Sequence, residues 1–109
     1  MQPGVRYADI RPYTVPESLS ELAGPTSGIV SLPLSLDWSQ QSRYDLSVDK
    51  DRRRLYETVI REAMDVSELR RFLDEGLLLH LWPSLWLPGR AKSLWQERFP
   101  QLRSAAALV

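Results

Sequence analysis

Cysteine is absent from this chain of 109 residues, and histidine occurs once, at position 80. The lack of cysteine excludes disulfide bonds, thiol catalysis and cysteine-ligated zinc. His80 has no carboxylate three or four residues after it, so the sequence offers it no second metal ligand at helical spacing. We therefore expect no metal and no cofactor, and we interpret His80 as a partly buried imidazole among Leu78, Leu79 and Trp82.

Net charge and long apolar runs are also missing. The 14 basic and 14 acidic residues cancel, which leaves no overall field that would attract nucleic acid or an anionic membrane. No apolar run approaches the roughly 20 residues that a membrane-spanning helix needs, and the N-terminus lacks an apolar segment for export. These absences predict a cytoplasmic protein without a membrane partner.

Catalytic motifs are absent as well: the chain has no Walker loop, no Gly-x-Ser-x-Gly, no Gly-x-Gly-x-x-Gly and no His-Glu-x-x-His. The carboxylates of Glu57 and Glu62 are more simply explained by a solvated charge ladder than by acid-base catalysis. In that ladder Arg53, Glu57 and Arg61 follow one another at spacings of four. We therefore predict a protein that is not an enzyme and has no catalytic residue.

The apolar periodicity from Ser47 onward predicts a mainly α fold. Ser47, Asp65 and Asp74 are suited to cap helix N-termini, with Asp65 and Glu68 at capping-box spacing, and Pro100 disfavours helix in the residue before it. The predicted unit is a small bundle of about four short helices, near 48–63, 66–73, 75–82 and 88–99.

An extended, proline-rich arm precedes this bundle. Five of the eight prolines fall within residues 1–46, where only two helical turns, over 16–23, and an alternating segment over 28–38 are expected. Pro33 cannot donate to a sheet, so the alternating segment is an edge strand or a docked ribbon. The predicted organisation is an arm over 1–46, a helical domain over 47–103 and a flexible tail over 104–109.

Tryptophan is concentrated around two prolines in the segment Leu81–Arg90. Trp82, and Trp95 further along, fall on the apolar stripes of their helices and are predicted to be core residues. Trp86 lies in a loop between two prolines, where burial by the domain itself is hardest. Because tryptophan is the residue most enriched at binding hot spots, Trp86 is predicted to contact a partner.

Basic clusters leave a second interpretation open. Arg52–Arg54 and Arg70–Arg71 are interspersed with acids, which weakens any attraction to phosphate. The helix near 88–98 has a polar face with Arg90, Lys92 and Arg98 as candidate nucleic-acid contacts, although its link to the preceding helix is longer than a tight helix-turn-helix turn.

Several segments resemble small bacterial proteins that accompany nucleotidyltransferase-type toxins of the type IV toxin–antitoxin and abortive-infection class. Together they cover most of residues 19–100. The resembling segments are Leu19–Gly28, Leu36–Ser39, Tyr44–Leu46, Leu55–Ala63, Leu81–Leu85 and Leu87–Pro88.

This resemblance implies an antitoxin-like partner of such a toxin, with no catalytic role. An arm that orders on contact could wrap the toxin and hold it inactive. The residues expected to bind the partner are Trp38, Tyr44, Trp86 and Arg90. The alternative function is a small DNA-binding transcriptional regulator that uses the helix at 88–98.

Overall fold

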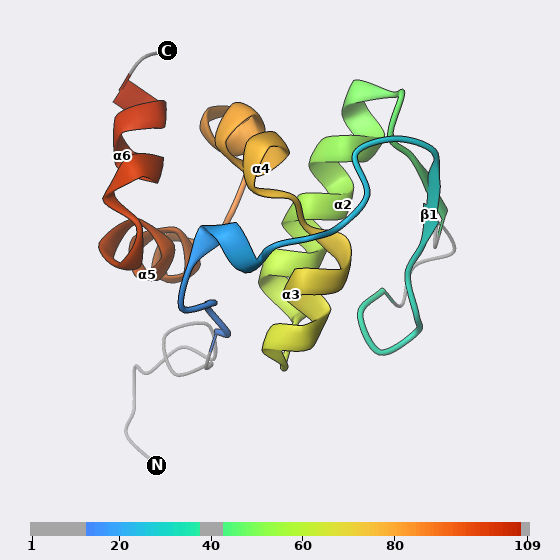
Figure 1. Ribbon diagram of the computed structural model, residues 1–109, viewed down its shortest axis with the longest axis horizontal. Helices are drawn as coiled ribbons and strands as arrows, with labels where there is room; N and C mark the ends of the chain where they lie inside the picture. The colour runs from blue at the N-terminus through green and yellow to red at the C-terminus, as the bar shows by residue number, and fades with distance from the viewer. Residues whose placement is uncertain (1–12, 38–42, 108–109) are drawn as a thin grey trace, which may run out of the picture.

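The computed structural model describes residues 13–37 and 43–107, with side chains as far as residue 104 (Figure 1). The described chain is mainly α-helical, as expected, with one sheet of two strands. In chain order the elements are η1 (Leu19–Glu21), β1 (Ile29–Ser31), β2 (Arg43–Asp45), α2 (Asp49–Glu62), α3 (Val66–Phe72), α4 (Glu75–Leu81), η2 (Trp82–Ser84), α5 (Gly89–Arg98) and α6 (Pro100–Ala107).

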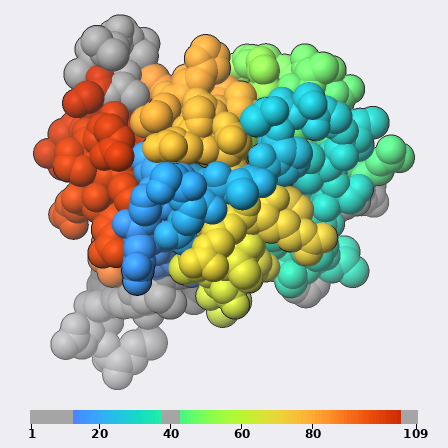
Figure 2. All heavy atoms as spheres, viewed as in Figure 1, coloured from blue at the N-terminus to red at the C-terminus, as the bar shows by residue number. Residues whose placement is uncertain are grey.

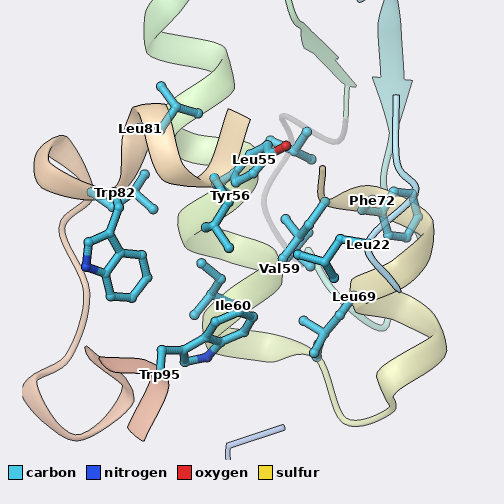
Figure 3. Packing of buried hydrophobic residues seen from close by; sticks show 14 of the residues in the cluster. Leu22, Leu55, Tyr56, Val59, Ile60, Leu69, Phe72, Leu81, Trp82 and Trp95 are labelled. Atoms are coloured by element: carbon cyan, nitrogen blue, oxygen red, sulfur yellow. The ribbon is translucent and has the colours of Figure 1, made fainter. Parts of the chain in front are cut away.

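The longest helix, α2, runs through the middle of the molecule between β1 and the C-terminal helices (Figure 1). Leu55, Tyr56, Val59 and Ile60 form its inner face and are fully shielded from solvent. Figure 3 shows this apolar stripe in the centre of the core, between the tryptophans of η2 and α5 and the apolar side chains of α3. The stripe at helical spacing is therefore the face on which the other elements pack.

The two short helices after α2 begin at aspartates, as the sequence predicts. The Asp65 carboxylate accepts a hydrogen bond from the Ser67 N–H at 2.8 Å, and the Asp74 carboxylate accepts one from the Leu77 N–H at 3.0 Å. Each bond satisfies one of the N–H groups that a helix start leaves without a partner. The second bond of the expected capping box differs. The Glu68 carboxylate accepts from the Met64 N–H and not from the N–H of Asp65, the next residue.

The start of α2 differs from the prediction. Val48, not Ser47, is the N-cap of this helix, and it makes no side-chain cap bond. Ser47 is engaged elsewhere, because its N–H and its hydroxyl both donate to Asp45, at 2.9 and 2.7 Å. Such a local turn around an aspartate competes with capping by the neighbouring serine.

The C-terminal end also differs from the prediction, because a further helix follows Phe99. Phe99 has φ −128° and ψ 89°, as expected before a proline, but Pro100 then opens a further helix, α6. Proline is well tolerated at the first helical position. Leu102 of α6 is fully buried, and 104–107, which the sequence assigns to a tail, continue the same helix.

Residues 13–37, the N-terminal segment, lie across the face formed by α3 and α4, as the blue and cyan spheres in Figure 2 show. The predicted helical turns of this segment reduce to the three residues of η1, which begins with a capping box between Ser18 and Glu21. Leu19 and Leu22 point into the core and are 2% and 5% exposed.

Backbone contacts then fix this segment on the junction between α3 and α4. The Gly24 N–H donates to the Leu73 carbonyl at 2.7 Å, and the Ala23 N–H donates to the Arg70 carbonyl at 3.0 Å. A Cβ atom at position 24 would lie 2.5 Å from the Phe72 carbonyl carbon. Only glycine permits this approach.

The alternating segment predicted over 28–38 forms a strand only at Ile29–Ser31. This strand pairs antiparallel with Arg43–Asp45 in a two-stranded sheet, so the edge-strand interpretation is confirmed. The strand ends before Pro33, and a turn follows in which Leu34 is exposed. The alternation therefore extends beyond the residues that are paired.

Buried side chains of the predicted arm belong to the same core as the helices. The boundary near residue 46 thus separates two kinds of secondary structure, whereas the core is shared. The arm contributes Leu19, Leu22, Val30, Leu32, Leu36, Tyr44 and Leu46 to it.

Trp82 and Trp95 are core residues, as predicted, with 1% and 0% of their surface exposed. Their ring centroids are 6.3 Å apart, and Phe99 lies 6.0 Å from Trp95 in a similar tilted arrangement. Such tilted aromatic contacts stabilise beyond the area that they bury. They join η2, α5 and the residue before α6.

We expect Gly24→Ala to lower the free energy of unfolding by about 1–3 kcal/mol, the usual cost of forcing extra atoms into a packed site. The new methyl group would have to displace backbone, and the hydrogen bond to Leu73 would lengthen. Urea denaturation followed by circular dichroism measures the change.

Gly89→Ala is the matched control, because no heavy atom lies within 4 Å of a Cβ at that position. This variant should be neutral or more stable, since alanine restricts the unfolded chain. Equal losses for the two variants would contradict the role given to Gly24.

Candidate functional site

Trp86 is the most exposed large hydrophobic residue of the described chain, with 87% of its surface accessible. It lies in the loop between η2 and α5, directly after Leu85, which is only 6% exposed. The Leu85 N–H donates to the Trp82 carbonyl at 3.2 Å, and the Pro88 carbonyl accepts the Lys92 N–H at 3.0 Å. The loop is thus tied at both ends while the indole between them faces solvent.

A carboxylate from α2 holds the middle of this loop. The Trp86 N–H donates to Glu57 at 2.7 Å, across 29 residues of sequence. A hydrogen bond to a charged acceptor is short and stronger than one between neutral groups. Glu57 therefore fixes the backbone of the exposed residue.

The expected surface ladder through Glu57 is wrong in its pairing. Arg53 binds Asp49 at 2.6 Å, and Arg61 binds Glu62 at 3.0 Å. The Glu57 carboxylate meets the loop N–H because tertiary packing brings that group within reach. Spacing along one helix could not reveal such a partner.

A cleft of about 180 Å³ lies beside the exposed indole. Arg61, Trp86, Leu87 and Pro88 line it. Three of these four residues are apolar, and the fourth brings a guanidinium to the edge. This composition suits one apolar side chain next to an anionic group.

Tyr44 does not belong to this surface, contrary to the sequence-based expectation. It is 2% exposed, lies opposite Val30 in the sheet and donates its hydroxyl hydrogen to the buried Asp37. The residue is held in the core by its ring and by this hydrogen bond, so it cannot contact a partner. Trp38, also expected to bind the partner, lies outside the described residues.

The basic residues of α5 are exposed, but they do not share one side of the helix. Arg90 and Arg98 line two adjoining hollows that share Leu94 and Glu97. At about 100° per residue, Lys92 lies roughly 160° around the axis from Arg90. The structure therefore does not bring Arg90, Lys92 and Arg98 together on a single face.

His80 is exposed, not partly buried as expected. Within residues 13–37 and 43–107, no three histidine, aspartate or glutamate side chains gather closely enough to hold a metal ion. Among these residues, no helix combines the length and apolar character needed to cross a membrane.

Sequence reasoning identified Trp86 but missed Glu57, Arg61 and Leu87 as its neighbours. One signal in the sequence could have pointed to these neighbours: Glu57 and Arg61 lie four residues apart, on the solvent face of α2. The position of the loop over that face depends on the packing of η2 and α5, which no local pattern encodes.

No protein-family model, curated protein or solved structure matches this chain. The site is therefore interpreted from its geometry.

We expect Glu57→Ala to speed hydrogen exchange of the Trp86 amide by at least about tenfold, because hydrogen bonds to charged groups contribute about 1.5–3 kcal/mol. Glu57→Gln is the control, since its amide oxygen can still accept the bond. Exchange followed by NMR distinguishes the two variants. Unchanged protection in Glu57→Ala would mean that the loop is held by other contacts.

Alkaline pH should destabilise the protein through two buried tyrosines. Burial is the largest cause that raises the pKa of Tyr44 to about 12, assisted by the neighbouring Asp37. Burial likewise raises the pKa of Tyr56, whose hydroxyl oxygen accepts the Asp74 N–H at 2.9 Å, to about 12.

Between pH 10 and 12 these tyrosines ionise in the unfolded chain but remain protonated in the folded one. The stability that they contribute is complete below pH 10 and is lost as the pH rises through 12. We expect the free energy of unfolding to fall across this interval. The fall with pH should be less steep in Tyr44→Phe and in Tyr56→Phe, because each variant lacks one of the two ionising groups. Denaturation titrations at a series of pH values measure the slope, and an unaltered slope in both variants would contradict the assignment.

Proposed function

We propose that this protein is a non-catalytic binding module that holds a protein partner through the surface formed by Trp86, Leu87, Pro88 and Arg61. The observation that carries the proposal is an 87% exposed tryptophan in a loop that is fixed by Glu57 and placed beside a cleft. Exposed aromatic surface of this kind is typical of interaction hot spots.

The energetics support a contact role for this side chain. Tryptophan presents a large area that remains in water in the isolated chain, and burial contributes about 25 cal/mol for each Å² of apolar surface. Because the loop is already ordered, little conformational entropy is lost when a partner covers it. A single residue can then contribute a substantial share of the binding free energy.

The resemblance noted in the sequence favours a nucleotidyltransferase-type toxin as the partner, with this chain acting as its antitoxin. We place the contact on the Trp86 surface instead of on a wrapping arm. Wrapping by residues 13–37 would require Leu19, Leu22 and Val30 to leave the core. Docking through an exposed loop carries no such cost.

The second candidate, a DNA-binding regulator, retains one supporting observation: Arg90, Lys92 and Arg98 are all exposed on α5. Their distribution around the helix makes it the weaker candidate, since a recognition helix presents its contacts to the groove on one face. A salt-dependent gel shift on the DNA upstream of the gene, lost in Arg90→Ala plus Arg98→Ala, would favour it.

We expect Trp86→Ala to weaken capture of the cognate protein by about 2 kcal/mol or more, as truncation of a hot-spot tryptophan usually does. The candidate partner is a nucleotidyltransferase-type protein encoded next to this gene. Co-expression and co-purification with the tagged chain test the complex, and rescue of growth by the wild type but not by the variant tests neutralisation.

Leu34→Ala is the matched control, because Leu34 is also an exposed apolar residue, at 74%, but lies in the turn after β1. It should bind as the wild type does. Undiminished capture and growth rescue by Trp86→Ala would overturn the proposal.

A further inference from the structure

Four charged residues form a stripe along the solvent face of α2. Lys50, Arg54, Glu57 and Arg61 recur at spacings of four, three and four, which places them within about 60° of one another around the helix axis. Lys50 and Arg54 are exposed, and the side chain of Arg61 is 41% exposed. The stripe occupies the middle of the face opposite the buried residues of α2.

Two of the three cations on this stripe, Lys50 and Arg54, have no ion-pair partner among the described residues. The third cation, Arg61, binds Glu62 through its Nε at 3.0 Å. The neighbouring Arg52 and Arg53 both bind Asp49. Packing thus divides the arginine triplet into two paired residues and one that is left for the stripe.

Glu57, the only acid of the stripe, is already engaged by the Trp86 N–H. Arg61 belongs both to the stripe and to the lining of the apolar cleft. The stripe therefore leads to the cleft beside Trp86 through three cations and Glu57, with Lys50 at its far end. Apolar surface and positive charge are continuous here.

We propose that the occupant of this surface is an acidic protein segment with one apolar side chain. The apolar side chain enters the cleft of Trp86, Leu87 and Pro88, and carboxylates of the same segment lie along Arg61 and Arg54. This inference rests on the proposed function and adds the chemistry of the partner. Charge complementarity of this kind fixes register and speeds association.

A peptide fits this arrangement better than a nucleic acid does. Phosphates recur at every nucleotide, so one of them would face the Glu57 carboxylate in the middle of the stripe. A peptide can place its carboxylates only opposite the cations. The cleft also accepts an aliphatic side chain, which a nucleic acid does not have.

The test uses the full-length chain and a fluorescein-labelled peptide of alternating glutamate and glycine with one central leucine. Fluorescence anisotropy should show saturable binding that weakens as salt is added. We expect affinity to fall about tenfold or more when leucine is replaced by alanine or when the glutamates are replaced by lysines. An oligothymidine of similar length should bind more weakly than the acidic peptide.

Charge reversal on the protein identifies the surface. Lys50→Glu plus Arg54→Glu should lower the affinity for the acidic peptide by about tenfold or more and raise the affinity for the lysine peptide. Lys92→Glu plus Arg103→Glu reverses two exposed cations on α5 and α6 and should leave both affinities unchanged. Circular dichroism of each variant checks that the fold is retained.

Three results would overturn the inference: no saturable binding of the acidic peptide, equal binding of the lysine peptide, or tighter binding of oligothymidine. Failure here is distinguishable from failure of the proposed function. If Trp86→Ala abolishes capture of the cognate protein while Lys50→Glu plus Arg54→Glu leaves it intact, the binding module stands and only its acidic partner segment is rejected.

Discussion

The fold depends on one backbone contact, where Ala23 and Gly24 lie against the junction of α3 and α4. Both helices have seven residues, fewer than an isolated helix needs to be stable in water. The N–H groups of residues 23 and 24 hold the last turn of α3 and the link to α4, because they donate to the carbonyls of Arg70 and Leu73. The side chain of Arg70 also binds Glu21 at 3.0 Å, so the same junction is fixed from the side. Two short helices thereby acquire a fixed geometry against α2.

That geometry leaves α2 covered on both flanks and free on its outer face. On one flank, the sheet is attached by the ring of Tyr44 and by its hydrogen bond to Asp37. On the other, Trp82 and Trp95 cover the helix (Figure 3), and the loop of residue 86 meets it at Glu57. The remaining face is polar, and Arg61 at its end lines the cleft beside Trp86, which is exposed. The exposure of the surface around Trp86 is thus a consequence of how the core is filled.

Local features could be predicted from the sequence, and contacts between distant segments could not. Asp74 caps α4 through a bond to an N–H only three residues away, and a bond over so short a separation can be predicted from the sequence. Pro100 was interpreted as the end of a helix, although it opens α6. Proline is compatible with either position, and the burial of α6 against the core determines which one it takes. The buried position of Tyr44 and the close approach of Gly24 depend on partners far away in sequence. The exposure of Trp86 was predictable from its prolines, whereas its anchor on Glu57 was not.

The same run of residues supplies both the core and the exposed site, and its helical period separates the two. In η2 the chain turns once every three residues, which places Trp82 and Leu85 on the same inward side, 1% and 6% exposed. The next residue, Trp86, is rotated away from that side and cannot follow them into the core. Pro88 then restricts the backbone before α5, and the bond from Glu57 removes most of the freedom that remains. An exposed tryptophan on a mobile loop would lose much of its contact energy to ordering on binding. Held as it is here, the indole is preorganised for the contact that we propose, and the core residues that precede it supply the anchor.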